Sequence, residues 1–254
     1  MKYFIVTDVH SFYNIMIDAL QEAGFDKTNK EHIFVSLGDL LDRGDSPLQC
    51  LRYVNSLPQK ILIRGNHEDL LEEAISRKDF LRHDFANGTV QTVIDLVSDV
   101  NKINSMDDVF YNISHNEELN KYLDSLQDYY EDEKNIFVHG WIPCKFNKKS
   151  ETFTEYEDWH SGDWLNARWV NGMEAWHNNI KVPNKTIYCG HWHTSWGHKY
   201  LHNSSAEWDN RYSTNPAHRK ADFSPFIDDG IVALDACTAY SHKINVYVID
   251  TEVT

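Results

Sequence analysis

Two short polar strings, GDLLDRG at residues 38–44 and RGNHE at residues 64–68, each follow an apolar run in this chain. The run before the first string is HIFVSL (32–37), and the run before the second is KILI (60–63). Short apolar runs of this kind predict buried β-strands. Carboxylate, guanidinium and amide groups at the ends of buried strands are costly to desolvate unless a partner compensates them. The two strings therefore raise the question of what that partner is.

The segments around these strings alternate between strand and helix patterns. Helical spacing predicts helices over residues 11–25 and 47–57, between the first three apolar runs. We expect strands at residues 3–8, 32–39, 60–67, 135–140, 185–193, 230–237 and 243–250. This order predicts an α/β fold with an at least partly parallel sheet, in which right-handed crossovers bring the strand ends to one edge.

The chain is interpreted as a single domain, residues 1–254, that carries two insertions. Residues 68–134 are polar and mostly helical in pattern, which predicts a helical subdomain with a solvated face. Residues 145–185 form a Trp-rich insertion whose tryptophans either pack its core, the favoured interpretation, or stack on a base or peptide. Residues 199–229 are predicted to form a long polar loop.

The charge of the chain limits its partners. The formal net charge of −15 disfavours non-specific binding to nucleic acid and to anionic membranes. A phosphorylated substrate remains compatible with this charge, because a bound metal ion reverses the local field. No apolar run is long enough to span a membrane and the first residues do not form a signal peptide, so we expect a soluble cytoplasmic protein. The four widely spaced cysteines predict buried free thiols.

Residues with oxygen or imidazole ligand atoms end five of the predicted strands. They are Asp8, His10, Asp39, Asn66, His139, His191 and His193. Any one of these motifs alone is typical of a turn cap. Five such strand ends in succession, each directly after an apolar run, instead predict a centre that binds divalent metal ions.

These motifs resemble those of the metallophosphoesterase (calcineurin-like) superfamily. The resemblance rests on DVH at 8–10, GDLLDRG, RGNHE, HG at 139–140 and GH at 190–191. The complete GDLLDRG and RGNHE strings are similar to the serine/threonine phosphoprotein phosphatase branch, especially its bacterial and phage members. The resemblance implies a metallophosphoesterase β-sandwich, in which two mixed β-sheets are flanked by helices (α/β/β/α), with a helical insertion and a dinuclear metal centre at the strand ends.

The resemblance also implies a role for each matching residue. The implied ligands of the first ion are Asp8, His10 and Asp39, and those of the second ion are the bridging Asp39, Asn66, His139 and His191. His67 would be the general acid, oriented by Asp42. The implied phosphate-binding residues are Arg43, Asn66 and Arg168, the last of which matches through WLNAR at 164–168. We expect Mn²⁺ as the metal, with Fe, Zn or Ni as alternatives.

Several positions depart from the family's usual pattern. Thr7 and Ser11 stand where glycines usually flank the first motif, and Trp141 stands where a second glycine commonly follows HG. GHWH at 190–193 has the G-H-x-H form of the wider superfamily, in which the second His also binds the first ion. His193 is therefore either a further metal ligand or a hydrogen-bonded neighbour. These changes lie around the substrate opening and leave the substrate class open.

The sequence thus predicts a metal-dependent phosphoester hydrolase in which two ions activate a water. The favoured activity is that of a phosphomonoesterase on phosphoserine or phosphothreonine in proteins, because the Asp of DRG is intact. The alternative is a nucleotide, polynucleotide or dinucleoside-polyphosphate phosphatase or phosphodiesterase, which the GHWH ending and the tryptophans favour. A non-catalytic metal-binding protein is a more remote alternative, because it would be expected to lose one of the residues named above. The expected partner is a phosphorylated protein or small molecule.

Overall fold

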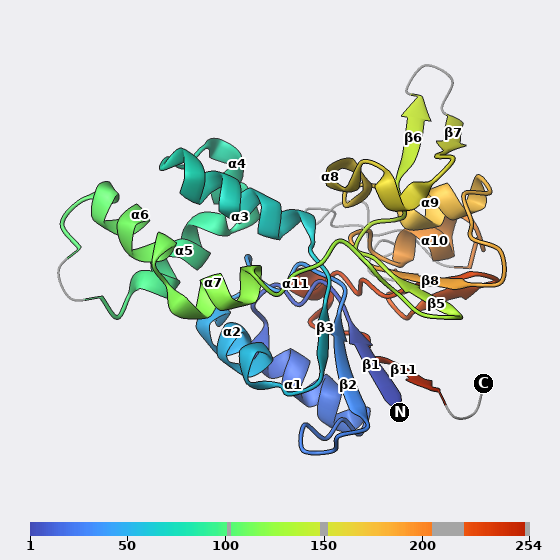
Figure 1. Cartoon of the computed structure of the whole chain (residues 1–254), viewed down its shortest axis with the longest axis horizontal. Helices are drawn as coiled ribbons and strands as arrows, with labels where there is room; N and C mark the ends of the chain where they lie inside the picture. The colour runs from blue at the N-terminus through green and yellow to red at the C-terminus, as the bar shows by residue number, and fades with distance from the viewer. Residues whose placement is uncertain (101–102, 148–151, 205–220, 252–254) are drawn as a thin grey trace.

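In the computed structural model, two β-sheets face each other and helices cover their outer sides (Figure 1). The structure describes residues 1–100, 103–147, 152–204 and 221–251. Both large sheets contain parallel and antiparallel strand pairs. The predicted fold class, two mixed sheets flanked by helices, is confirmed.

The first sheet has the strand order β11-β1-β2-β3. Its strands are β1 (Lys2–Val6), β2 (His32–Ser36), β3 (Lys60–Leu62) and β11 (Tyr247–Asp250). The first three run parallel, and β11 pairs antiparallel with β1. The helices α1 (Tyr13–Glu22) and α2 (Pro47–Ser56) connect the parallel strands, as predicted. Pro47 suits the first turn of α2, because a proline there removes no helical hydrogen bond.

The second sheet has the order β4-β5-β8-β10-β9. Its strands are β4 (Tyr130–Glu131), β5 (Asn135–Phe137), β8 (Thr186–Cys189), β9 (Phe226–Asp228) and β10 (Ile231–Ala233). The three central strands run parallel and the two outer ones are antiparallel to their neighbours. The carboxyl ends of the parallel strands in each sheet therefore open toward one edge.

Alternating side chains of the strands build the layers. Tyr3 and Ile5 of β1 face the second sheet and pack with Phe137 and Tyr188, while Phe4 and Val6 face the helices. A third buried cluster lies on the outer side of the second sheet. Each fully buried large apolar side chain contributes about 1.5–3 kcal/mol, so these clusters hold the strand ends in place.

Two groups of elements project from the sandwich on opposite sides (Figure 1). One group contains α3 (Asn66–Arg77), α4 (Arg82–Asn87), α5 (Thr89–Val97), α6 (Met106–Ser114) and α7 (Glu117–Leu123). The other contains β6 (Cys144–Asn147), β7 (Thr152–Glu155), the 3₁₀-helix η1 (Trp159–Ser161), α8 (Trp164–Ala167) and α9 (Gly172–His177). They correspond to the predicted insertions at 68–134 and 145–185, of which 101–102 and 148–151 lie outside the described residues. That these insertions behave as units within one domain stays a prediction.

The expectation of a polar loop over 199–229 is wrong in part. Helix α10 (Ser195–Tyr200) extends into this range, and β9 forms an edge of the second sheet near its end. Phe226 of β9 is fully buried, and Ile227 pairs with Val232 of β10, which explains the extra strand. Residues 205–220 lie outside the described part of the chain. A last short helix, α11 (Thr238–Ser241), follows β10.

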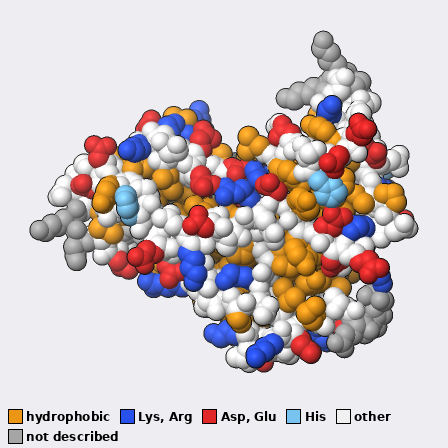
Figure 2. Space-filling view, in the orientation of Figure 1, with side chains coloured by type: hydrophobic (Ala, Val, Ile, Leu, Met, Phe, Trp, Pro, Cys, Tyr) orange, Lys and Arg blue, Asp and Glu red, His pale blue; other side chains and the backbone are white. Residues whose placement is uncertain are grey.

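Acidic side chains are spread over the face shown in Figure 2 and are interspersed with Lys and Arg. Among the described residues, no helix combines the length and apolarity needed to cross a membrane. All four cysteines are free thiols, as predicted. Only Cys50 and Cys189 are fully buried, whereas Cys144 and Cys237 are half-buried.

Candidate metal centre

The predicted ligands leave the sheets at the carboxyl ends of β1, β2, β3, β5 and β8. Several of them have a left-handed backbone, which is uncommon for residues other than glycine. Their φ angles are 50° at Asp8, 51° at His10, 54° at Asp39 and 66° at His191. Such conformations persist only where the surroundings enforce them, and they concentrate at functional sites. Gly65 permits this crowding, because a side chain there would collide with the Asp39 carboxylate.

His139, Asn66 and Asp39 form the deepest part of the centre. The Nδ1 atom of His139 lies 2.7 Å from the carbonyl oxygen of Leu37, so Nδ1 carries the proton that it donates. Its Nε2 then faces Asn66 Oδ1 at 2.9 Å and Asp39 Oδ1 at 3.4 Å. A neutral His139 would face these two oxygens with a nitrogen lone pair, so this point needs a positive charge, supplied either by a proton on Nε2, which the raised pKa of His139 favours while no ion is bound, or by a bound cation. The donor set therefore fits a divalent cation.

A second group of ligand atoms shares Asp39. His10, Asp39 and His67 have ligand atoms within 4.8 Å of one another, as do Asp39, His139 and His191. His10 Nε2 lies 3.9 Å from Asp39 Oδ2 and 3.8 Å from Asp8 Oδ1. Its Nδ1 donates to the carbonyl of Leu41 at 3.0 Å, which leaves Nε2 as the available ligand atom. Asp39 is thus placed between two candidate cation positions.

Asp8 is held by its neighbours. One of its oxygens, Oδ2, accepts hydrogen bonds from Thr7 Oγ1 at 2.6 Å and from the backbone N–H of His191 at 2.9 Å. Thr7 thus orients the Asp8 carboxylate, although the resemblance predicts glycine at this position. The free oxygen, Oδ1, faces His10.

His67 and Asp42 form the predicted pair. The His67 Nδ1 atom lies 2.8 Å from Asp42 Oδ2, and both residues are buried. The same carboxylate oxygen accepts a hydrogen bond from Thr89 Oγ1 at 2.8 Å. Burial alone would lower the pKa of His67, but the charge of Asp39 and the contacts to Asp42 outweigh it and raise that pKa. The pair can therefore hold a proton at His67, as a general acid requires.

Arg43 reaches the candidate ligand His10 and the predicted general acid His67. Its Nη1 lies 2.9 Å from His10 Nε2, and its Nη2 lies 3.1 Å from His67 Nε2. Arg43 has a φ of 62° and is exposed, so its guanidinium extends from the loop over the ligands. The predicted phosphate contact is compatible with this position, because two N–H groups of one guanidinium point to the same side.

The imidazoles at the centre differ in their electrostatics. Burial lowers the pKa of His191 to about 3. Burial, and next the charge of Arg43, lowers the pKa of His10 well below its usual value. For His139 burial acts in the same direction, but Asp39, Asp8 and Glu68 raise its pKa to about 10. Two neutral imidazoles and a surplus of buried carboxylates are what a cation-binding centre needs.

Two of the predicted site residues, Arg168 and His193, have hydrogen-bond partners outside the candidate ligand groups. Arg168 is buried and donates to Asp69 Oδ2 at 2.7 Å and to Asp128, so its role as a phosphate clamp stays a prediction that requires these ion pairs to open. His193 Nδ1 lies 2.8 Å from Ser195 Oγ, outside the two candidate ligand groups found in the described residues. Whether His193 is a ligand stays a prediction.

Sequence reasoning missed four residues at the centre. Glu68 accepts hydrogen bonds from backbone N–H groups, and Asp235 is a buried carboxyl whose pKa burial and Asp8 raise well above its usual value. Asp235 follows β10 in the same way as the other ligands follow their strands, so the same signal was available. Asn87 and Trp169 line the cavity. The only sequence signal at Asn87 is the Asn-Gly pair, which is typical of a turn.

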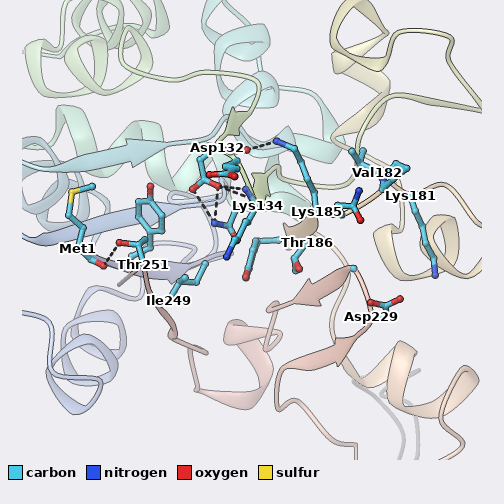
Figure 3. A pocket seen from close by; sticks show the side chains of 17 residues that line it. Met1, Asp132, Lys134, Lys181, Val182, Lys185, Thr186, Asp229, Ile249 and Thr251 are labelled. Atoms are coloured by element: carbon cyan, nitrogen blue, oxygen red, sulfur yellow. Dashed lines mark hydrogen bonds between the residues drawn. The ribbon is translucent and has the colours of Figure 1, made fainter. Parts of the chain in front are cut away.

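The cavity over the centre is small. Its volume is about 120 Å³, and it is lined by Asp8, Asp39, Arg43, Asn66, His67, Leu70, Asn87, Trp169 and His191. A larger cavity of about 960 Å³ lies at the opposite edge of the sheets, where Lys134, Lys181 and Asp229 surround it (Figure 3). None of the predicted site residues lines that second cavity.

A family model described as calcineurin-like phosphoesterase matches residues 1–206. The chain belongs to this family. Over 70 residues (28% of this chain and 31% of the relative) it is 34% identical to serine/threonine-protein phosphatase 1 of Salmonella typhimurium. Over 69 residues (27% and 24%) it is 32% identical to a symmetrical bis(5'-nucleosyl)-tetraphosphatase of Buchnera aphidicola. Each match spans less than a third of the relative's own length.

The whole fold is similar to solved structures. A crystal structure of a provisionally assigned diadenosine tetraphosphatase superposes with a TM-score of 0.50, covering 98% of this chain and 89% of the other. The two sequences are 15% identical, so the likeness supports the fold alone. It agrees with the sandwich of mixed sheets described above.

Proposed function

We propose that this chain is a metal-dependent phosphomonoesterase with a dinuclear centre, Mn²⁺ being the first choice of metal. The observation that carries the proposal is the position of Asp39 between His10 on one side and His139 on the other. Two ions bound there would activate a water and stabilise charge on the phosphoryl oxygens. The proposed ligands are Asp8, His10 and Asp39 for one ion and Asp39, Asn66, His139 and His191 for the other, with His193 as a further candidate.

The other residues of the site bind phosphate and move a proton. Arg43, exposed at the cavity and with two parallel N–H groups, would neutralise the equatorial phosphate oxygens, joined by Asn66 and by Arg168 if its ion pairs open. His67 would donate the proton on its Nε2 to the leaving-group oxygen. Asp42 holds the opposite nitrogen and so fixes the ring orientation and stabilises the charged form.

The first candidate substrate is a phosphoserine or phosphothreonine side chain in a protein. The similarity to a serine/threonine-protein phosphatase supports this candidate, as does the intact Asp42–His67 pair. The second candidate is a nucleotide or dinucleoside polyphosphate, which the nearly equal identity to a symmetrical tetraphosphatase supports. A metal-binding protein without catalysis is disfavoured, because the acid, the arginine and four of the proposed ligands, Asp8, Asp39, Asn66 and His191, line one cavity.

Metal removal followed by reconstitution tests the proposal. The protein is stripped with a chelator, reloaded with Mn²⁺, and assayed on a phosphoserine peptide and on diadenosine tetraphosphate. We expect activity only after reloading, and near-complete loss in Asp39→Asn together with a lower metal content. Asp45→Asn, which changes an exposed carboxylate of the same loop, is the matched control. Full activity in the stripped protein would contradict the proposal.

The role of His67 is tested by varying the leaving group. An alkoxide needs a proton far more than a nitrophenolate does, and general acid catalysis is typically worth about 10²–10⁴-fold. His67→Asn should therefore lower kcat/KM much more on the phosphoserine peptide than on p-nitrophenyl phosphate. Equal losses on both substrates, with metal content unchanged, would show that His67 orients the site without donating a proton.

A further inference from the structure

Trp169 is exposed at the mouth of the cavity over the metal centre. The solvent-exposed fraction of Trp169 is 48%, whereas the other described tryptophans are buried or half-buried. Its side chain lines the same cavity as His67, Arg43 and His191. The Trp169 ring meets the His191 ring at a centroid distance of 5.7 Å and an interplanar angle of 83°. A large aromatic surface thus stands in water directly beside the candidate reacting groups.

The backbone that carries Trp169 is fixed on several sides. Its N–H donates to the carbonyl of Asn166 at 3.0 Å, and the preceding Arg168 is anchored to Asp69 of α3. The N–H of Trp141 donates to the carbonyl of Ala167 at 3.1 Å, which ties this turn to the loop that carries His139. The ring is therefore presented from a pre-organised backbone, which lowers the entropic cost of binding a ligand against it.

The cavity has a polar floor and an apolar wall. Carboxylates, imidazoles and the Arg43 guanidinium line the floor, while Trp169 and Leu70 contribute the large apolar side chains of the lining. A volume of about 120 Å³ is sufficient for a phosphate group. Under the proposed function, the phosphate occupies the floor, and the group on its leaving oxygen must pass beside the apolar wall.

We propose that Trp169 is a specificity-determining residue that stacks against a planar ring attached to the leaving-group oxygen. The preferred substrates are then aryl phosphate monoesters, of the kind that a phosphotyrosine side chain presents. The ring has to lie close to the phosphorus, because Trp169 contacts His191, itself a candidate metal ligand. This inference rests on the proposed phosphomonoesterase function, and it places aromatic phosphate monoesters ahead of phosphoserine and phosphothreonine as substrates of the site.

Non-hydrolysable phosphonates test this inference without any influence of leaving-group chemistry. Dissociation constants are measured on the Mn²⁺-loaded protein for inorganic phosphate, methylphosphonate, benzylphosphonate and cyclohexylmethylphosphonate. Aromatic pairs contribute beyond their buried area, so wild type should bind benzylphosphonate roughly two- to tenfold more tightly than the cyclohexyl compound of similar size. Trp169→Ala should bring this ratio to about one, and Trp169→Phe should keep most of it.

Leu165→Ala is the matched control, because Leu165 is a 59% exposed apolar residue of α8 that does not line the cavity. It should leave all four constants unchanged. An undiminished ratio in Trp169→Ala, or equal binding of the two ring compounds by wild type, would overturn the inference. Failure of inorganic phosphate to bind wild type at all would instead overturn the proposed function itself.

Discussion

Replacing Glu68 by Gln tests how the backbone beneath the metal centre is held. Glu68 is 1% exposed, and its carboxylate accepts four hydrogen bonds. One oxygen, Oε2, accepts from the N–H groups of Asp39 at 3.0 Å and Gly65 at 2.8 Å. The other, Oε1, accepts from the N–H of Leu40 at 3.0 Å and the hydroxyl of Tyr122 at 2.9 Å. Four donors around one side chain require two acceptor oxygens, which only the carboxylate supplies.

The expected cost follows from this count. An amide retains one acceptor oxygen, so two of the four hydrogen bonds are lost and the new NH₂ group faces donors. Hydrogen bonds to charged groups contribute about 1.5–3 kcal/mol each, which gives a loss of about 3–6 kcal/mol in the free energy of unfolding. This is a large fraction of the roughly 5–15 kcal/mol typical of a folded protein. In either orientation of the amide, the N–H of Asp39 or that of its neighbour Leu40 loses its acceptor, so the loop that carries Asp39 is held less firmly and Mn²⁺ binding should weaken as well.

Urea unfolding of wild type, Glu68→Gln and Glu72→Gln measures the effect. Glu72 lies one turn further along α3, has a 44% exposed side chain and pairs with Arg64, so it serves as the control. An exposed ion pair is worth about 0–1 kcal/mol, and Glu72→Gln should stay within that range. Equal losses of stability in the two variants would refute the reasoning, as would unaltered Mn²⁺ affinity in Glu68→Gln.

Three further outcomes are expected. Thr89→Val, which removes the hydroxyl bound to Asp42, should lower kcat on alkyl phosphates more than on p-nitrophenyl phosphate at equal metal content. Arg168→Ala should weaken inhibition by inorganic phosphate, and unchanged inhibition would leave Arg168 with a purely structural role. The hydrogen bond to Glu131 raises the pKa of His160, so its stabilising effect is present below the unfolded pKa of about 6.5 and is lost as pH rises through the folded value. His160→Gln should therefore destabilise the protein at about pH 5.5 but not at about pH 9, as thermal unfolding at the two values would show.

The strand ends could be predicted from sequence because a simple rule links them. An apolar run becomes a buried strand, and parallel strands end at one edge, so Asp8, Asp39 and His139 had to come close together. The same rule applied to Asp235, although no role was expected for it. This rule could not predict which of Arg168 and Trp169 is buried, because the two residues are neighbours in a short turn. Only the structure shows that Arg168 is buried and that Trp169 is exposed.

The helical insertion supports the centre directly, which no sequence pattern indicated. Asp42 receives hydrogen bonds at its carboxylate from Thr89, and its N–H donates to Thr92 at 3.1 Å, both on α5. Glu68 receives its fourth bond from Tyr122 of α7. Asp42, the hydrogen-bond partner of His67, and the loop that carries Asp39 are thus each held by a helix of the insertion. A change that loosens α5 or α7 should therefore alter catalysis even when every ligand and every strand remains in place.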